Sequence, residues 1–569
     1  MTTFASGTDT LTRDALTVLQ PGFTGTTAPD WLLRRLGEGL ASVGLFGRNI
    51  ASPEQLAALT AQLRAERDDV LVAIDEEGGD VTRLEVRTGS SFPGNHALGA
   101  VDDVALTEEV ARELGRRLAA CGVNLNWAPS ADVNSNPANP VIGVRSFGAD
   151  TGLVARHTAA YVTGLQAAGV AACTKHFPGH GDTAVDSHHA LPRIDADLSV
   201  LHSRELVPFR AAIAAGSRAV MSAHILVPAL DPDRPATLSR RILTGLLREE
   251  LGYDGLIVTD GMEMQAIAAT YGIERGSVLA IAAGADAICV GGGLADDDTV
   301  RRLRDALVSA VRAGELPEER LADAANRVRA LAEWTAAASA ARKASPALSG
   351  PAVLSSTNGL NSSNGSNTSG GTGGASGAGG VNGSGGTGVT GGANGAAGTG
   401  GTGSSDGADG PDGADGATAV RAADVGLVAA RRALTVTRSA SYTPLAEAPF
   451  VAALTPVANI AVGDETPWGV AAELARLLPG TETGSFAGED AGSSALAAAA
   501  GRPLVAVVRD EHRHPWMAAA LDVLLASRPD TVVVEMGVPQ SAPRGALHIA
   551  THGAARVCGQ AAAEVIAGA

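Results

Sequence analysis

The chain has 569 residues, of which 45% are hydrophobic and only 3% aromatic, and a formal net charge of −18 at pH 7. This length predicts at least two domains, with cores built from alanine, valine, leucine and isoleucine. The acidic balance, together with the lack of a run rich in lysine or arginine, argues against nucleic acid as a partner.

The first residues, MTTFASGTDTLTRDALTVLQPGF, lack a basic segment followed by an apolar one, so we expect no secretory signal. No stretch approaches the roughly 18 apolar residues of a membrane helix. The four cysteines are scattered and form no CxxC motif: Cys121, Cys173, Cys289 and Cys558. This pattern is typical of small core residues in a reducing compartment. We therefore predict a cytoplasmic protein with no membrane partner.

Up to about residue 340, short apolar runs alternate with amphipathic helical patterns such as ALTEEVARELGRRLAACG and DTVRRLRDALVSAVRAG. In chain order, the expected strands include DVLVAIDEEGG, VNLNWAPSADV, VAACTKHFPGHGD, SRAVMSAHI, GLIVTDGMEM and DAICVGGG. Strands that alternate with helices predict a parallel α/β architecture. Roughly eight such units favour a (β/α)8 TIM-type barrel over an open sheet for residues 1–340.

Residues 345–418 consist almost entirely of glycine, serine, asparagine, threonine and alanine. Such a segment buries too little apolar surface to offset its ordering entropy, so we expect a long, flexible linker. Residues 420–569 follow, with PLVAVVRD, HPWMAAALDVLLASRP, TVVVEMG, GALHIATHG and AARVCGQAAAEVIAG. These runs predict a smaller C-terminal α/β sandwich domain in the order β-α-β-β-α.

Polar side chains follow the strands of the predicted barrel where each strand ends: Asp75, Asn126, Lys175, His224 and Asp260. In a barrel these positions converge on the face that carries the active site. A carboxylate after an apolar strand needs either solvent or a partner. Because Asp260 precedes a glycine and an expected helix, a helix N-cap is an alternative role for it.

The segment TKHFPGHGDTAVDSHHALP, residues 174–192, is unusually rich in titratable side chains. Asp186 lies two residues before His188, so its carboxylate can orient the imidazole within one tight turn for proton transfer near neutral pH. A metal site is the alternative, with ligands from His176, His180, Asp182, Asp186, His188 and His189. Acid–base chemistry is favoured because barrel metal sites usually draw ligands from several strands. We expect no metal and no other cofactor.

The pattern KHFPGHG, a short gap and then DSH resembles the signature of bacterial family 3 glycoside hydrolases, in their β-N-acetylglucosaminidase (β-hexosaminidase) branch. The family's order continues through GLFGRNI, DEEGG, NLNWAPSADVNSNPANPVIGVRSFG, VMSAHI and LIVTDGMEM. The resemblance covers residues 10–335 densely and the C-terminal domain more loosely. The linker is longer than the family's usual connection, and the C-terminal domain is short.

The resemblance implies a retaining, exo-acting hydrolase that removes terminal β-linked N-acetylglucosamine from cell-wall muropeptides or chitin-type fragments. It implies that Asp260 is the nucleophile, which forms a covalent glycosyl intermediate, and that His188 is the general acid/base with Asp186 as its partner. It also implies a set of substrate-binding residues: Asp75, Arg83, Arg145, Lys175 and His176.

Two other functions stay open at this point. A neutral imidazole acid/base does not repel an anionic acceptor, so a phosphorylase that uses inorganic phosphate and releases a sugar 1-phosphate is the alternative enzyme. A non-catalytic sugar-binding barrel is ranked lower, because it would need Lys175 and Arg145 but neither Asp260 nor the Asp186–His188 pair. The expected partner is a small carbohydrate, with phosphate as an open second substrate.

Overall fold

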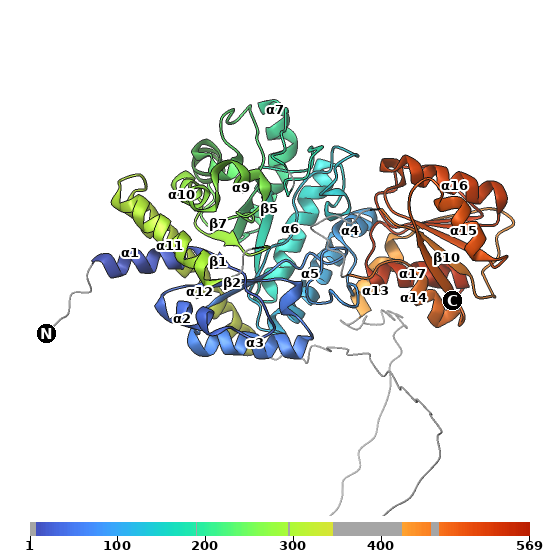
Figure 1. The fold of residues 1–569 in the computed structure, drawn as a ribbon, viewed down its shortest axis with the longest axis horizontal. Helices are drawn as coiled ribbons and strands as arrows, with labels where there is room; N and C mark the ends of the chain where they lie inside the picture. Colours follow the sequence, from blue (N-terminus) through green and yellow to red (C-terminus); the bar gives the residue numbers. More distant parts are fainter. Residues whose placement is uncertain (1–6, 189, 294–295, 345–423, 457–465) are drawn as a thin grey trace, which may run out of the picture. The chain divides into compact units, whose positions relative to one another are not determined.

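The computed structural model of the chain describes residues 7–188, 190–293, 296–344, 424–456 and 466–569 (Figure 1). The parts before and after residues 345–423 each contain a parallel sheet covered by helices. The expected linker, residues 345–418, lies outside the described residues, so its flexibility and the exact domain boundaries stay predictions. Within the described ranges, no helix is both long and apolar enough to cross a bilayer.

Eight short parallel strands in the described part of residues 7–344 form the barrel. Strands β2 to β7 pair in chain order, and β1 pairs with β8. A bridge between Val258 and Ala287 joins β7 to β8, and Ser42 Oγ donates a hydrogen bond to Leu19 O (3.3 Å), which joins β2 to β1. The strands are β1 (Leu19–Pro21), β2 (Ser42–Leu45), β3 (Leu71–Ile74), β4 (Leu125–Asn126), β5 (Ala171–Phe177), β6 (Ala219–Ser222), β7 (Leu256–Thr259) and β8 (Ile288–Val290). The predicted (β/α)8 fold is confirmed.

Helices surround the barrel, and several begin at an aspartate whose side chain accepts a backbone N–H of the first turn, as Asp103, Asp150 and Asp296 do. They are α1 (Gly7–Thr17), α2 (Asp30–Glu38), α3 (Pro53–Glu66), α4 (Asn95–Val101), α5 (Val104–Ala120), α6 (Thr151–Ala167), α7 (Leu198–Val200), α8 (Leu206–Ala214), α9 (Gln265–Tyr271), α10 (Ile273–Ala283), α11 (Asp297–Arg312) and α12 (Glu318–Ala344). Residues Leu201–Glu205 and Arg241–Glu250 are helical with π-type hydrogen bonding.

The barrel strands alternate between an inward and an outward face, as the pleat requires. In β3, Leu71 and Ala73 belong to the interior cluster, whereas Val72 and Ile74 pack outward against the helices. Leu331 of α12 joins the same interior cluster. Because α12 packs into the barrel where the strands start, the opposite end, where the strands finish, is the one left for a pocket.

The C-terminal part is a six-stranded sheet with helices on both faces (Figure 1). The strand order is β11-β10-β12-β13-β14-β9, and β9 runs antiparallel to β14. The strands are β9 (Thr435–Arg438), β10 (Phe450–Leu454), β11 (Glu482–Phe486), β12 (Leu504–Val508), β13 (Val532–Glu535) and β14 (Leu547–Ala550). The helices are α13 (Val425–Ala433), α14 (Ala471–Leu477), α15 (Ala491–Ala499), α16 (Pro515–Ser527) and α17 (Arg556–Ala567). The predicted α/β sandwich is present, and the structure adds β9, β10 and β11 to it.

Candidate active site

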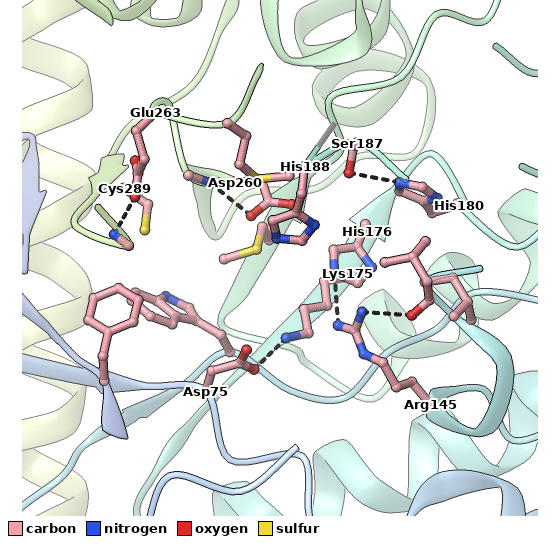
Figure 2. Close-up of a pocket in the computed structure, with 18 of the residues that line it drawn as sticks. Asp75, Arg145, Lys175, His176, His180, Ser187, His188, Asp260, Glu263 and Cys289 are labelled. Atoms are coloured by element: carbon pink, nitrogen blue, oxygen red, sulfur yellow. Dashed lines mark hydrogen bonds and ion pairs between the residues drawn. The ribbon is translucent and has the colours of Figure 1, made fainter. Parts of the chain in front are cut away.

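A pocket of about 520 Å³ lies at the end of the barrel where the strands finish (Figure 2). Seven of the eight residues singled out from the sequence line it: Asp75, Arg83, Arg145, Lys175, His176, His188 and Asp260. The eighth, Asp186, is hydrogen-bonded to His188. Residues far apart in the sequence meet here because all parallel strands of a barrel finish at the same end.

Charged groups cluster on one side of the pocket. Lys175 Nζ lies 2.5 Å from Asp75 Oδ1 and 2.8 Å from Glu77 Oε1, and Arg83 Nη2 lies 3.6 Å from Asp75 Oδ2. Burial by itself would lower the pKa of Lys175, but the two carboxylates outweigh it and raise that pKa, so the ammonium stays charged. Fixed charged donors and acceptors of this kind suit the recognition of hydroxyl groups.

His176 is oriented by a buried carboxylate. Its Nδ1 lies 2.7 Å from Asp132 Oδ2, and its Nε2 lies 3.3 Å from Nη2 of Arg145. Burial opposes ionisation of Asp132, but the His176 ring beside it outweighs burial and holds the pKa of that carboxyl well below its usual range. Asp132 therefore stays ionised and directs the other edge of the His176 ring toward Arg145 and the pocket.

Asp260 directly follows the buried strand β7, and its Oδ1 accepts a hydrogen bond from Gly261 N (2.8 Å). Burial would raise the pKa of Asp260, but the nearby imidazoles, with His224 the strongest, and the Gly261 N–H outweigh burial and lower it to about 2. The carboxylate is therefore ionised at neutral pH and held at a rigid strand end. It is not a helix N-cap, because α9 begins at Gln265, after Met264.

Asp186 and His188 form the hydrogen-bonded pair that their spacing predicts. Oδ1 of Asp186 lies 2.7 Å from His188 Nδ1 and also accepts the backbone N–H of His188 at 2.9 Å. Because Nδ1 is occupied by the carboxylate, Nε2 is the nitrogen that can exchange a proton in the pocket. Figure 2 shows the His188 ring beside Asp260.

The base of the loop that carries this pair is firmly held. Nδ2 of Asn139 donates to the carbonyl oxygens of His180 and Gly181, at 3.0 Å each. His180 Nδ1 lies 2.9 Å from Thr183 Oγ1, and its Nε2 lies 3.2 Å from Oγ of Ser187, the residue between Asp186 and His188. Burial lowers the pKa of His180 to about 4, so this ring is neutral and acts as a hydrogen-bonded brace.

Gly181 allows a close approach between this loop and the neighbouring one. A Cβ at residue 181 would lie 1.7 Å from Val133 O. We therefore expect Gly181→Ala to destabilise the fold by about 1–3 kcal/mol and to lower kcat, because the dyad loop must shift to relieve the clash. Thermal unfolding and steady-state turnover measure both effects. Ala184→Gly, in the exposed part of the same loop, is the control, and parent-like values for Gly181→Ala would contradict the steric argument.

Glu76 supports Arg83 from within the protein. The side chain is buried, and its Oε2 accepts the backbone N–H groups of Arg83 (2.7 Å) and Leu84 (2.8 Å). Burial raises the pKa of Glu76 to about 7. The folded chain therefore binds this proton more tightly than the unfolded chain, and Glu76 makes the protein less stable as the pH rises from about 4.5 to 7.

This decrease in stability with rising pH predicts how Glu76→Gln changes the melting temperature. The amide keeps the shape and can accept the same N–H groups, but it carries no buried charge at high pH. We expect the variant to melt on the order of a few degrees higher than the parent at pH 8, and at nearly the same temperature at pH 5. Thermal unfolding followed by circular dichroism measures the difference, and an equal loss at both pH values would contradict the buried-charge account.

Of the residues proposed as alternative metal ligands, those that the structure describes contact other protein groups. His176 contacts Asp132, and Asp186 contacts His188. His189 lies outside the described residues. Among the side chains that the structure describes, no three of histidine, cysteine, aspartate or glutamate are placed to share one metal ion.

The barrel region of the sequence matches a known protein family. Residues 29–331 match the N-terminal domain of glycosyl hydrolase family 3. The chain belongs to glycosyl hydrolase family 3. This family was expected from KHFPGHG and DSH, and the expectation is confirmed. The family match lies within the barrel that carries the pocket.

Three similar proteins indicate the branch of the family that the chain resembles. The beta-hexosaminidase A of Pseudoalteromonas piscicida is 37% identical over 309 residues, 50% of this chain and 52% of that protein. The chain thus spans about half the length of this relative. The beta-hexosaminidase of Chromobacterium violaceum is 38% identical over 258 residues, 44% of this chain and 71% of that protein. A solved family 3 beta-N-acetylglucosaminidase from Paenibacillus sp. str. FPU-7 is similar with a TM-score of 0.76 and 31% identity, over 98% of this chain and 96% of that one.

Some residues that line the pocket of this family 3 barrel were not predicted from the sequence. They are mainly aromatic or sulfur-containing: Phe46, Trp127, Met221, Glu263, Met264 and Cys289. The signal for Trp127 was its place directly after Asn126 at an expected strand end. Phe46 and Trp127 lie together, with ring centroids 6.1 Å apart, and they form an apolar part of the pocket lining.

Asn126, the last residue of β4, and His224, just after β6, do not line the pocket themselves. Asn126 exchanges hydrogen bonds with the backbone of Glu76, through Oδ1 (3.0 Å) and Nδ2 (2.7 Å). His224 lies between Thr237 Oγ1 (2.8 Å) and Gly261 O (3.0 Å). Both therefore fix the strand ends that carry pocket residues.

Proposed function

We propose that the chain is a retaining, exo-acting β-N-acetylglucosaminidase that hydrolyses terminal β-linked N-acetylglucosamine. The observation that carries this proposal is the meeting of Asp260 and the Asp186–His188 pair at one pocket. A retaining glycosidase needs an ionised carboxylate to attack the anomeric carbon and a second group to protonate the leaving oxygen. The names of the relatives, beta-hexosaminidase and beta-N-acetylglucosaminidase, support the same substrate class.

In the first step, a carboxylate oxygen of Asp260 bonds to the anomeric carbon while the bond from that carbon to the leaving oxygen breaks. The proton on Nε2 of His188 passes to the leaving oxygen. The Gly261 N–H donates to Oδ1 of Asp260, so we assign the attack to Oδ2. Asp186 keeps Nδ1 of His188 protonated and stabilises the cationic ring before the proton transfer.

In the second step, the neutral His188 ring takes a proton from water at Nε2. The oxygen of that water bonds to the anomeric carbon, and the ester bond to Asp260 breaks. Two displacements on the same carbon retain the β configuration. The ionised state of Asp260, whose pKa is lowered to about 2, suits both the attack and the departure.

The charged side of the pocket supports the proposed exo mode. Asp75, Lys175 and Arg145 line the pocket, and in this proposal they bind the hydroxyl and acetamido groups of one terminal sugar. The barrel beneath them is filled by side chains such as Leu71 and Cys173, so the sugar chain cannot continue inward. The aglycone must then project from the pocket, which fits fragments of a cell-wall muropeptide or a chitin-type oligosaccharide.

Release of 4-nitrophenol from 4-nitrophenyl N-acetyl-β-glucosaminide tests the proposal. We expect turnover without phosphate, and much less turnover of the matched β-glucoside, which lacks the acetamido group. Turnover that depends on added phosphate and yields the sugar 1-phosphate would favour the phosphorylase alternative. Equal turnover of the two glycosides would contradict the proposed substrate.

We also propose that the enzyme acts in the cytoplasm. The four cysteines, Cys121, Cys173, Cys289 and Cys558, are free and buried, as is usual in a reducing compartment. Fractionation of cells that produce the tagged chain tests this location.

A further inference from the structure

The segment after β3 carries a carboxylate that the mechanism above does not use. Glu77 lies behind the pocket wall and is only 4% exposed. Its Oε1 lies 2.6 Å from Arg145 Nη2 and 2.8 Å from Lys175 Nζ, and its Oε2 accepts a hydrogen bond from Arg145 Nε at 3.0 Å. One carboxylate thus contacts two of the cations that line the pocket.

Glu77 is itself held in place by its backbone. The Glu77 N–H donates to Val81 O (3.0 Å), and the Glu77 carbonyl accepts the hydroxyl proton of the buried Tyr161 (3.1 Å). The next two residues, Gly78 and Gly79, both have left-handed φ angles, 78° and 64°. A Cβ at Gly79 would lie 2.4 Å from Gly94 Cα, so only glycine fits at this position. The backbone that follows Glu77 therefore has a fixed path.

The cations need this carboxylate because they are buried together. Lys175 is 2% exposed and Arg145 is 6% exposed. Two like charges in a buried site repel each other unless an anion lies between them. Asp75 also contacts Lys175, but Asp75 lines the pocket and is available to sugar hydroxyls. Glu77 is not part of the pocket lining, so its contacts with both cations do not compete with substrate.

We propose that Glu77 is a positioning residue for sugar binding: it holds Arg145 and Lys175 side by side with their remaining N–H groups toward the pocket, without touching the sugar. The inference rests on the proposed function, because it assigns the sugar grip to these two cations. In this arrangement the DEEGG segment supplies Asp75 to the sugar, Glu76 to the Arg83 backbone, and Glu77 to the two cations.

Glu77→Gln tests the inference, because it keeps the shape and removes the charge. The interactions of Arg145 and Lys175 with the sugar exist before and during reaction, so their loss appears mainly in KM. We expect kcat/KM to fall on the order of tenfold to a hundredfold, mostly through KM, as when a partner that orients a binding group is lost. The Kd of free N-acetylglucosamine, measured by calorimetry, rises by a similar factor.

Asp286→Asn is the matched control. Asp286 is also fully buried and pairs with arginines, Arg248 and Arg320, but it precedes β8 at the end of the barrel away from the pocket. We expect this variant to melt at a lower temperature with parent-like KM and Kd. A merely structural Glu77 would behave in the same way, so a parent-like KM and Kd in Glu77→Gln overturns the inference.

A double-mutant cycle with Arg145→Ala separates a positioning role from an independent one. If Glu77 acts through Arg145, the loss from Glu77→Gln shrinks in the Arg145→Ala background. If the loss in the double variant equals the product of the two single losses, the residues act independently. That result overturns the inference and leaves the proposed function intact. If the parent neither turns over the chromogenic glycoside nor binds the sugar, both proposals fail. Should Glu77→Gln not fold, Glu77→Asp keeps the charge but shortens its reach, and a parent-like KM there overturns the inference equally.

Discussion

Replacement of Asp260 by alanine is expected to lower kcat on the 4-nitrophenyl glycoside by at least about 10⁴-fold, the scale of loss seen when a catalytic nucleophile is removed. Asp260 directly follows β7, its pKa is lowered to about 2, and its carboxylate accepts the Gly261 N–H. An ionised, rigidly placed carboxylate is what attack on the anomeric carbon requires. Steady-state kinetics on parent and variant measure the loss.

Two comparisons make this prediction specific. Azide fits the space left by the shortened side chain, so it should restore turnover of Asp260→Ala and give the α-glycosyl azide. Glu263 is a further carboxylate of the pocket lining, but its Oε1 accepts the Gly291 N–H at 2.9 Å and braces the turn after β8. We expect Glu263→Gln to lose about tenfold or less, since an amide oxygen can accept the same bond. A larger loss for Glu263→Gln than for Asp260→Ala would move the nucleophile to residue 263.

Replacement of His188 by alanine should produce a loss that depends on the leaving group. A sugar alcohol leaves only when protonated, so we expect a fall in kcat/KM of about 10²–10⁴-fold on a chitobiose-type substrate. The 4-nitrophenolate ion leaves without a proton, so the loss on the chromogenic glycoside should be much smaller in the first step. Asp186→Asn should show the same dependence more weakly, because Asp186 acts on the proton transfer only through its 2.7 Å contact with His188 Nδ1.

The measurement is the ratio of kcat/KM on the two substrates in parent, His188→Ala and Asp186→Asn. The proposed role requires this ratio to change strongly for His188→Ala. Equal losses on both substrates would show that His188 binds or orients the sugar and does not transfer the proton. The pKa of His180, lowered to about 4, makes that neighbouring ring a poor substitute acid at neutral pH.

The barrel and most of its pocket could be predicted because their signals are local. Strands such as β3 (LVAI) and β7 (LIVT) are short apolar runs, and Asp75 and Asp260 directly follow them, where a barrel gathers side chains. Lys175 was expected just after its strand but lies within β5, two residues before its end. The pairing of Asp186 with His188 was predictable because the two residues lie within one turn.

Other parts of the site depend on contacts between distant residues. Glu77 lies only two residues after Asp75, and nothing in the sequence links it to Arg145, which is 68 residues away. Only the fold brings the two side chains into contact. Asn126 ends β4 and His224 follows β6, yet their side chains bond to backbone groups just after the neighbouring strands. Which residue at a short strand end faces the pocket depends on the local path of the chain, which spacing alone does not determine.

The edge strands of the C-terminal sheet were missed for a different reason. β9 (TVTR) and β11 (ETGSF) have mostly exposed or half-buried residues, because each has only one neighbouring strand. They therefore lack the apolar runs by which the central strands β12, β13 and β14 were recognised. The domain boundaries at residues 340 and 420 stay predictions.

Trapping of the covalent intermediate tests the central claim most directly. A 5-fluoro N-acetylglucosaminyl fluoride slows the second step more than it slows the first, so the ester accumulates and proteolysis with mass spectrometry locates it. The account predicts a sugar adduct on the peptide that contains Asp260. An adduct on another residue, or turnover with inverted configuration and no adduct, would contradict it.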